Sequence, residues 1–352
     1  MMSGSSDHLV REFTMLNIGI VGFGFMGRMH YRCWNQLPEA NVAAICDANP
    51  NIIADTQKAQ GNIEGAAQEI DFAKLNLYSD FEKMLADESL DAVSITLPTH
   101  MHPGFTIGAL RGGVHVLCEK PMALTVADCD EMIAVAEETG KTLQIGHCIR
   151  FWPEYARAKE IIDSGEYGKV RVAAFRRFTA PPTWSWQNWF FDASRSGGMV
   201  LDLHIHDADY VQYLFGLPPA VQSHAVTAEG GAVAYIHTHY LYDDNRIVTA
   251  EGGWTVTGSF GFEMSFHIML EKATLVYDCN RAPAFRLCPD QGEAVTPDLP
   301  AGDGYAHQIA HFADRILNAN TEPVITLEQS RAAIGLIDAE NQSVRNGEKI
   351  TL

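Results

Sequence analysis

The chain has 352 residues, a length that suits about two domains of ordinary size. Its 44 Asp and Glu residues outnumber 25 Lys and Arg, and the net charge of −19 disfavours nucleic acids and anionic membranes as partners. No apolar run reaches the roughly 18 residues that a membrane span requires, so we expect no membrane partner.

The first 14 residues, "MMSGSSDHLVREFT", differ from the rest of the chain because they contain no regular apolar pattern. They lack the apolar segment of a secretory signal, so we expect a flexible extension over residues 1–14 that ends before Met15. Seven cysteines without regular spacing predict reduced thiols. Together these features predict a cytoplasmic protein.

Residues 15–148 alternate between predicted strands and predicted helices. The clearest helix runs from Thr125, a residue type that favours the N-cap position, to Thr139. The strand-like runs between helices are "LNIGIV", "VAAIC", "DAVSITL", "VHVLC" and "TLQIG". This alternation predicts βαβ units, and therefore an α/β domain with a doubly wound parallel sheet over residues 15–148.

A glycine-rich loop, "IGIVGFGFMGRMH", joins the first strand to the first helix. Its glycines Gly22, Gly24 and Gly27 permit a tight turn and let the backbone approach a pyrophosphate at the helix N-terminus. Asp47 ends the second strand, where a carboxylate accepts hydrogen bonds from ribose hydroxyls and repels a 2′-phosphate. Its neighbours Ala48 and Asn49 bring no cation. The pattern predicts NAD as cofactor, in preference to NADP.

Two further strand ends carry polar side chains toward the expected ligand edge of the sheet. "SITLPTHMHP" follows the fourth strand, and we expect His102 to line the cofactor cleft. "VHVLCEKPM" ends the fifth strand with Lys120 followed by Pro121. A lysine in this position is either a solvated surface residue or a functional cation. Proline restrains the local backbone and allows a cis bond that would aim the lysine side chain.

The pattern changes over residues 149–352. One helical segment leads into "KVRVAAFRRF", and later strand-like runs follow one another without helices between them, which predicts an α+β domain on a large, mainly antiparallel sheet. Trp184, Trp186 and Trp189 are concentrated within "FTAPPTWSWQNWFFD". Such a cluster either packs a core or interface, or presents aromatic faces to a sugar ring, with Trp189 as a candidate substrate contact.

The stretch "SGGMVLDLHIHDADY" combines acidic and histidine side chains on a predicted helix. Apolar residues recur at helical spacing from Met199, which places Asp202 and His206 on one face. His204 points in nearly the opposite direction, so we expect no metal site here. On the residues alone, Asp202 and His206 are either a polar helix face or a catalytic pair.

Three motifs in this order resemble the Gfo/Idh/MocA oxidoreductase family, which includes glucose–fructose oxidoreductase and inositol dehydrogenase. They are the glycine loop from Gly22 to His30, the Glu-Lys-Pro at 119–121, and the run from Gly197 to Asp209. The resemblance extends from about Met15 to the end of the chain. It implies a Rossmann domain, then an α+β domain whose open sheet often mediates oligomerisation, here as a homodimer or homotetramer.

The resemblance also implies the chemistry. His206 matches the family's general acid/base, which takes the proton from an alcohol whose carbon loses hydride to nicotinamide. Asp202 would bind a substrate hydroxyl, and Lys120 would stabilise charge on the reacting oxygen. The implied activity is reversible oxidation of a secondary alcohol of a sugar, cyclitol or related polyol.

The same resemblance implies further site residues. Arg150 matches a family arginine near the nicotinamide, and Tyr305 matches a tyrosine that approaches the substrate. The chain departs from the family at Met199, where a third glycine is common, and at Thr99, where asparagine is common. The residues expected to contact the cofactor are Gly22, Phe23, Gly24, Phe25, Met26, Gly27, Asp47, Leu97, Pro98, Thr99, His102, Glu119, Lys120 and Arg150.

Two other functions remain compatible with these motifs. One is a glycosidase of the same family that uses bound NAD for transient oxidation. The other is an NAD-binding regulatory or sensor protein without catalysis, although a sensor has no need of Lys120, Asp202 and His206 together. Net NADH formation would distinguish the dehydrogenase from both.

Overall fold

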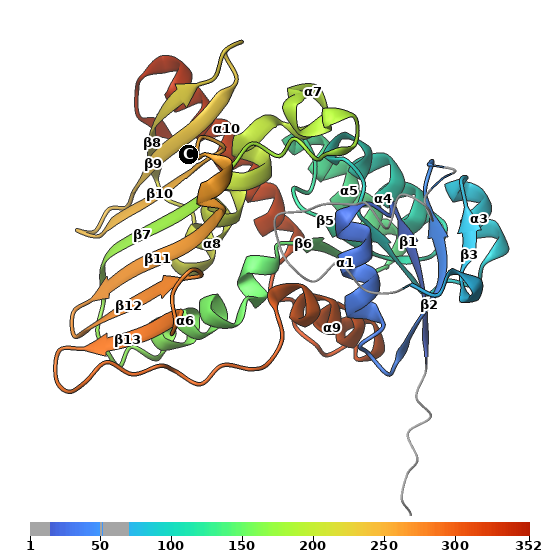
Figure 1. Cartoon of the computed structure of the whole chain (residues 1–352), viewed down its shortest axis with the longest axis horizontal. Helices are drawn as coiled ribbons and strands as arrows, with labels where there is room; N and C mark the ends of the chain where they lie inside the picture. Colours follow the sequence, from blue (N-terminus) through green and yellow to red (C-terminus); the bar gives the residue numbers. More distant parts are fainter. Residues whose placement is uncertain (1–14, 50, 52–69) are drawn as a thin grey trace, which may run out of the picture.

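The computed structural model describes residues 15–49, 51 and 70–352. The extension expected over residues 1–14 lies outside the described residues. Two sheets dominate the structure and occupy opposite halves of the molecule (Figure 1). None of the helices in the described ranges has a stretch apolar and long enough to cross a membrane.

The first sheet has six parallel strands in the order β3-β2-β1-β4-β5-β6. Its strands are β1 (Leu16–Val21), β2 (Ala40–Cys46), β3 (Asn76–Tyr78), β4 (Ala92–Ile95), β5 (His115–Glu119) and β6 (Leu143–Gly146). The order reverses between β1 and β4, and ligands of such sheets bind beyond the carboxyl ends of the strands at this point. The doubly wound parallel sheet predicted from the sequence is confirmed, with β3 as an additional short strand.

Helices connect these strands. They are α1 (Phe25–Trp34), α3 (Phe81–Asp87), α4 (His102–Arg111) and α5 (Val126–Thr139). Helix α5 begins where the sequence predicts, because the Thr125 hydroxyl accepts a hydrogen bond from the backbone N–H of Asp128 at 3.1 Å. Gly140, in the left-handed conformation, ends this helix.

The second sheet has eight strands in the order β13-β12-β11-β7-β10-β9-β8-β14, and β7 and β10 pair in parallel within an otherwise antiparallel sheet. The strands are β7 (Val170–Thr179), β8 (Ala220–Thr227), β9 (Val233–Leu241), β10 (Ile247–Gly253), β11 (Phe262–Leu270), β12 (Ala273–Asp278), β13 (Phe285–Pro289) and β14 (Ile350–Thr351). The large, mainly antiparallel sheet is confirmed. Strands β8, β13 and β14 were not predicted from the sequence.

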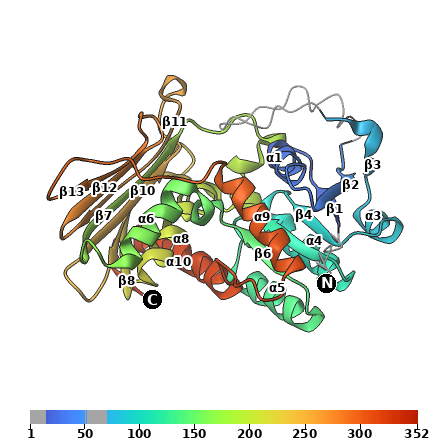
Figure 2. The same ribbon diagram turned by 90° about the horizontal axis from the view of Figure 1, so that it is seen from below.

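Helices α6 (Pro153–Ser164), α8 (Ile205–Phe215) and α10 (Leu327–Asn346) lie on the side of this sheet that faces the first domain (Figure 2). The opposite face carries no helix in the described part of the chain. Side chains alternate along the strands: in β7, Ala173, Phe175 and Arg177 are buried toward the helices, whereas Arg176 points outward and is exposed.

The C-terminal helices connect the two halves. Helix α9 (Gly304–Leu317) packs against α1, and the rings of Phe312 and Trp34 meet edge to face with centroids 6.1 Å apart. Helix α10 contacts both α8 and α5, and the ion pair between Arg331 and Asp130 joins it to α5. The chain segment after residue 300 therefore packs against the first domain as well as the second.

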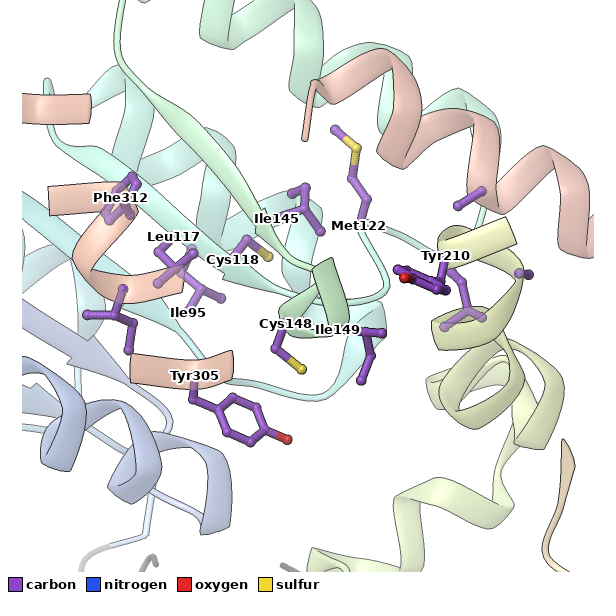
Figure 3. Close-up of a cluster of buried hydrophobic side chains, with 14 of the residues drawn as sticks. Ile95, Leu117, Cys118, Met122, Ile145, Cys148, Ile149, Tyr210, Tyr305 and Phe312 are labelled. Carbon is purple, nitrogen blue, oxygen red and sulfur yellow. The ribbon is translucent and has the colours of Figure 1, made fainter. Parts of the chain in front are cut away.

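Buried side chains of the two domains form one continuous apolar cluster. Figure 3 shows the part beside the first sheet, where Ile95, Leu117 and Ile145 lie near Phe312. Cys148 and Tyr305, at the edge of this cluster, both line a cavity between the two domains. The core thus ends where the two domains face each other.

Candidate active site

A cavity of about 1090 Å³ lies between the two domains. Its walls include the glycine loop and Asp47 from the first domain, and Asp202 and His206 from the second. Ligand pockets commonly enclose about 300–1,000 Å³, so this volume accommodates a dinucleotide together with a small substrate. We refer to this cavity as the cleft.

The glycine loop has the geometry that a pyrophosphate requires. Gly22 has a positive φ of +85°, and a Cβ on Gly27 would lie 2.1 Å from the Gly22 carbonyl oxygen, so the loop and helix approach too closely for any side chain there. Helix α1 begins at Phe25, and no side chain caps it at Gly24. The first N–H groups of α1 are therefore not occupied by a capping side chain, and they suit an anion.

Asp47 is fixed at the end of β2 by two backbone donors. The N–H groups of Phe23 and Asn49 donate to its two carboxylate oxygens at 2.6 and 2.8 Å. Asp47, Ala48 and Asn49 all line the cleft, and neither neighbour is a cation. These residues fit the adenosine ribose of a dinucleotide, and none of the three is a cation that could pair with a 2′-phosphate.

Lys120 and Asp202 meet in the middle of the cleft. The Lys120 ammonium donates to the Asp202 carbonyl oxygen at 2.6 Å and to its carboxylate at 3.0 Å. The Lys120–Pro121 peptide bond is cis. The two residues come from β5 and from the helical segment before α8, so the contact joins the two domains at the point where His206 also lines the cleft.

The helix expected from Met199 differs from the prediction in its first turns. Residues Val200–His204 form a π-helical turn, and the α-helix α8 begins at Ile205. His206 lines the cleft, whereas His204 faces the second domain, where its Nε2 lies 2.9 Å from buried Glu340. The two histidines therefore lie in different environments. Within the described ranges, no group of three or more His, Cys, Asp or Glu side chains is placed to hold a metal ion.

His206 is half-buried, with positive charges nearby. Burial lowers its pKa well below 6.5, and the nearby charges of Lys120 and Arg177 lower it further. Its Nδ1 has no hydrogen-bond partner among the described residues. The imidazole is consequently neutral at physiological pH and able to accept a proton.

This environment predicts a specific pH dependence. If His206 is the general base, the acid limb of kcat/KM reports its pKa in the free enzyme, and we expect that limb below pH 6.5. Because the folded pKa is lower than the unfolded one, the unfolded chain binds more protons in acid, so stability is full above pH 6.5 and declines below it. Initial rates from pH 4.5 to 8 test this, and a limb at or above 6.5 contradicts it.

Four of the predicted cofactor residues do not line the cleft, namely Gly27, Thr99, His102 and Arg150. Thr99 is buried, and the imidazole nitrogens of His102 lie 2.8 Å from the carbonyl oxygens of Leu97 and Pro121, two segments that flank the cleft. Arg150 is fully buried and binds the Asp209 carboxylate with two hydrogen bonds of 2.7 and 2.9 Å. The side chains of His102 and Arg150 therefore have structural partners within the protein.

Gly27 also lies behind the cleft surface, where its backbone packs against Gly22. The remaining predicted cofactor residues line the cleft: Gly22, Phe23, Gly24, Phe25, Met26, Asp47, Leu97, Pro98, Glu119 and Lys120. Most of the Glu119 side chain is buried, and its carboxylate lies 2.9 Å from His30 Nε2.

Both predicted substrate residues, Trp189 and Tyr305, line the cleft. The sequence did not single out Arg177, which also lines it and binds Asp207 through two hydrogen bonds of 2.8 and 3.0 Å. The sequence contained a sign of this role, because the two-residue alternation along β7 places the charged Arg177 side chain on the same buried face as Phe175. Trp254 and Phe262 were missed as well, since their strands appeared in the sequence as ordinary sheet segments.

Comparisons with known proteins agree with this architecture. Residues 16–147 match the family described as "Oxidoreductase family, NAD-binding Rossmann fold", and residues 155–276 match the "GFO/IDH/MocA C-terminal domain". The myo-inositol 2-dehydrogenase of Thermotoga maritima is 29% identical over 353 residues, which cover 96% of this chain and 98% of that protein.

Two further proteins share parts or all of this architecture. The 2,7-anhydro-N-acetylneuraminate hydratase of Mediterraneibacter gnavus is 30% identical over 248 residues, covering 66% of this chain and 60% of that protein. A structure of levoglucosan dehydrogenase with NADH and levoglucosan has the same fold, with a TM-score of 0.81 at 20% identity over 96% of this chain and 99% of that one. The chain belongs to the Gfo/Idh/MocA family of oxidoreductases, whose N-terminal domain is an NAD-binding Rossmann fold.

Proposed function

We propose that this protein is an NAD-dependent dehydrogenase that oxidises a secondary alcohol of a sugar, cyclitol or related polyol. The observation that carries this proposal is the meeting of Lys120, Asp202 and neutral His206 in the cleft, beside a glycine loop with the geometry of a pyrophosphate site. Inositol dehydrogenases among the relatives support the substrate class.

Each of these groups has a distinct role in the proposed reaction. The glycine loop and Asp47 would hold the dinucleotide, and bound NAD would supply the hydride acceptor. His206 accepts the proton of the substrate hydroxyl. The Lys120 ammonium stabilises negative charge that develops on the same oxygen, and the Asp202 carboxylate orients Lys120 and binds a neighbouring hydroxyl.

A substrate panel tests the proposal directly. We would monitor NADH absorbance with inositols, hexoses, sugar acids and amino sugars, with NAD and NADP in parallel. Turnover with one class and NAD supports the dehydrogenase. No NADH with any class, combined with tight NAD binding by calorimetry, contradicts it.

The choice of NAD over NADP is proposed to depend on Asp47. Asp47→Ala should weaken NAD binding by roughly 10-fold, since charge-assisted hydrogen bonds to the ribose are lost, and should improve the relative affinity for NADP because the repulsive charge is gone. Calorimetric Kd values for both cofactors measure this. Asp87→Ala, an exposed aspartate on α3, is the control. An equal loss for both cofactors would indicate only a loosened loop.

A redox-neutral reaction is the second candidate. One relative is named as a hydratase, and a hydratase changes no net oxidation state. An NAD-dependent glycosidase would likewise oxidise its substrate transiently, lose a leaving group and return the hydride. Product release without NADH accumulation identifies this class, whereas a sensor shows cofactor binding and neither product nor NADH.

We further propose a cytoplasmic homodimer or homotetramer that associates through the helix-free face of the second sheet. The absence of a covering helix on this face in the described residues supports the proposal. Light scattering at several protein concentrations measures the oligomeric state, and a monomer throughout would contradict it.

A further inference from the structure

The geometry points to a glycoside with an aromatic aglycone as the substrate, so that the cleft holds an aromatic ring in addition to the sugar. This inference rests on the proposed function, because the sugar part must reach Lys120, Asp202 and His206. It goes further by assigning a second half to the substrate.

Aromatic side chains dominate the second-domain wall of the cleft. Five of the chain's six tryptophans line the cleft, namely Trp152, Trp184, Trp186, Trp189 and Trp254. Three of them form a connected system with Phe190, whose ring centroid lies 5.6 Å from Trp184, 4.2 Å from Trp189 and 6.0 Å from Trp254. Clefts that bury a flat apolar ligand are lined in this way.

The wall continues along the sheet with apolar side chains. Phe262 and Met264 of β11 and Tyr277 of β12 line the same cleft. One aromatic face is enough to stack against the C–H face of a single sugar ring. The aromatic surface here extends from the loop at residues 184–190 past Trp254 to β11 and β12, which exceeds what one such ring covers.

Lys120, Asp202 and His206 form the main polar group of the cleft. Arg177 and Thr179 lie on β7, which pairs with β11 of the aromatic wall, and the Arg177 guanidinium is already bound by Asp207 through two hydrogen bonds. A second sugar or a free polyol would bring hydroxyls against the aromatic wall, where each buried hydroxyl without a partner opposes binding. An aromatic aglycone has no such hydroxyls and is favoured there.

A second hollow adds room beside this wall. It has a volume of about 370 Å³ and shares Trp152, Tyr277 and Cys279 with the cleft. Its other residues come mainly from the loops near Ala284 and Pro300. The second hollow therefore shares part of its wall with the cleft.

The decisive experiment compares matched glycosides on the full-length protein with NADH bound. Methyl and phenyl glycosides of glucose, galactose and xylose would be titrated by calorimetry and by tryptophan fluorescence, and their kcat/KM would be measured with NAD. For at least one sugar, we expect the phenyl glycoside to bind at least about 10-fold more tightly than the methyl glycoside, because a buried ring removes substantial apolar area from water.

Variants locate the ring. Phe262→Ala and Trp189→Ala should each lower the phenyl-to-methyl affinity ratio by about 3-fold or more, since each removes one aromatic contact. Phe260→Ala is the matched control, because Phe260 is 47% exposed and does not line the cleft. If Phe262→Ala does not fold, Phe262→Leu removes the ring and keeps most of the volume.

The outcomes separate this inference from the proposed function. Tighter phenyl binding without NADH formation supports the aglycone site and contradicts the dehydrogenase. Equal kcat/KM and equal affinity for both glycosides support the dehydrogenase and overturn the aglycone site. Binding of neither glycoside, or an affinity ratio unaffected in both Phe262→Ala and Trp189→Ala, also overturns it.

Discussion

His206→Ala is expected to lower kcat by roughly 10²- to 10⁴-fold, the usual contribution of a general base. The half-buried imidazole lines the cleft, its pKa is lowered by desolvation and by Lys120 and Arg177, and it is therefore neutral and able to accept a proton at physiological pH. Removing it leaves the substrate hydroxyl without a proton acceptor. Steady-state kinetics with NAD, once a substrate is known, measure the loss.

The variant must retain its cofactor for this result to be informative. NAD affinity measured by calorimetry should change little in His206→Ala, because the glycine loop and Asp47 are on the other domain. His307→Ala, on α9 and outside the cleft, is the matched histidine control and should keep full turnover. Undiminished turnover in His206→Ala would remove this residue from the mechanism.

Arg150→Met should lower the free energy of unfolding by about 3–5 kcal/mol, the usual result of removing one partner from a buried ion pair. The Arg150 guanidinium binds both oxygens of Asp209 and also donates to Gln329 Oε1 at 2.6 Å. Burial raises the pKa of Asp209, but the charges of Arg150 and His147, together with hydrogen bonds from Arg150 and Gln212, outweigh burial and lower it. Urea unfolding at pH 7 measures the change.

The sign of the pH dependence provides a second readout. Because the folded pKa of Asp209 is lowered, this pair stabilises the fold above the unfolded pKa of about 3.9 and is lost as pH falls below it. Arg150→Met should therefore destabilise less at pH 4 than at pH 7, since Asp209 can then be protonated. Arg157→Met, which removes an exposed pair with Glu160, should cost less than about 1 kcal/mol.

NAD affinity then distinguishes two roles for Arg150. A residue that contacts the nicotinamide, as the family resemblance implies, would raise the Kd for NAD when replaced. A residue that only anchors Asp209 would leave the Kd of the folded variant within about 2-fold. The buried position favours the second role.

Local sequence patterns predicted the parts of the fold and cleft that depend on neighbouring residues. The loop at Gly22–Gly27 requires glycine because its backbone turns sharply and approaches itself, and Asp47 comes directly after a strand whose end faces the ligand edge. The two-residue alternation of the strands and the spacing of Asp202 and His206 are also local properties. These local features can be predicted from the sequence without knowing how distant elements pack.

Tertiary packing decided the rest. The sequence shows that Arg150 carries a positive charge, but it does not show whether that charge contacts a cofactor or Asp209. Only the packing of α8 places the Asp209 carboxylate beside Arg150. The π-helical turn before α8 depends on surroundings that include Glu340, more than one hundred residues away. The aromatic wall likewise requires β10, β11 and the loop at 184–190 to converge. The sequence by itself determined the cofactor loop and the two-domain fold. The tertiary structure decided which charges are buried as pairs and what shape of substrate the cleft admits, because side chains far apart in the chain acquire partners only through packing.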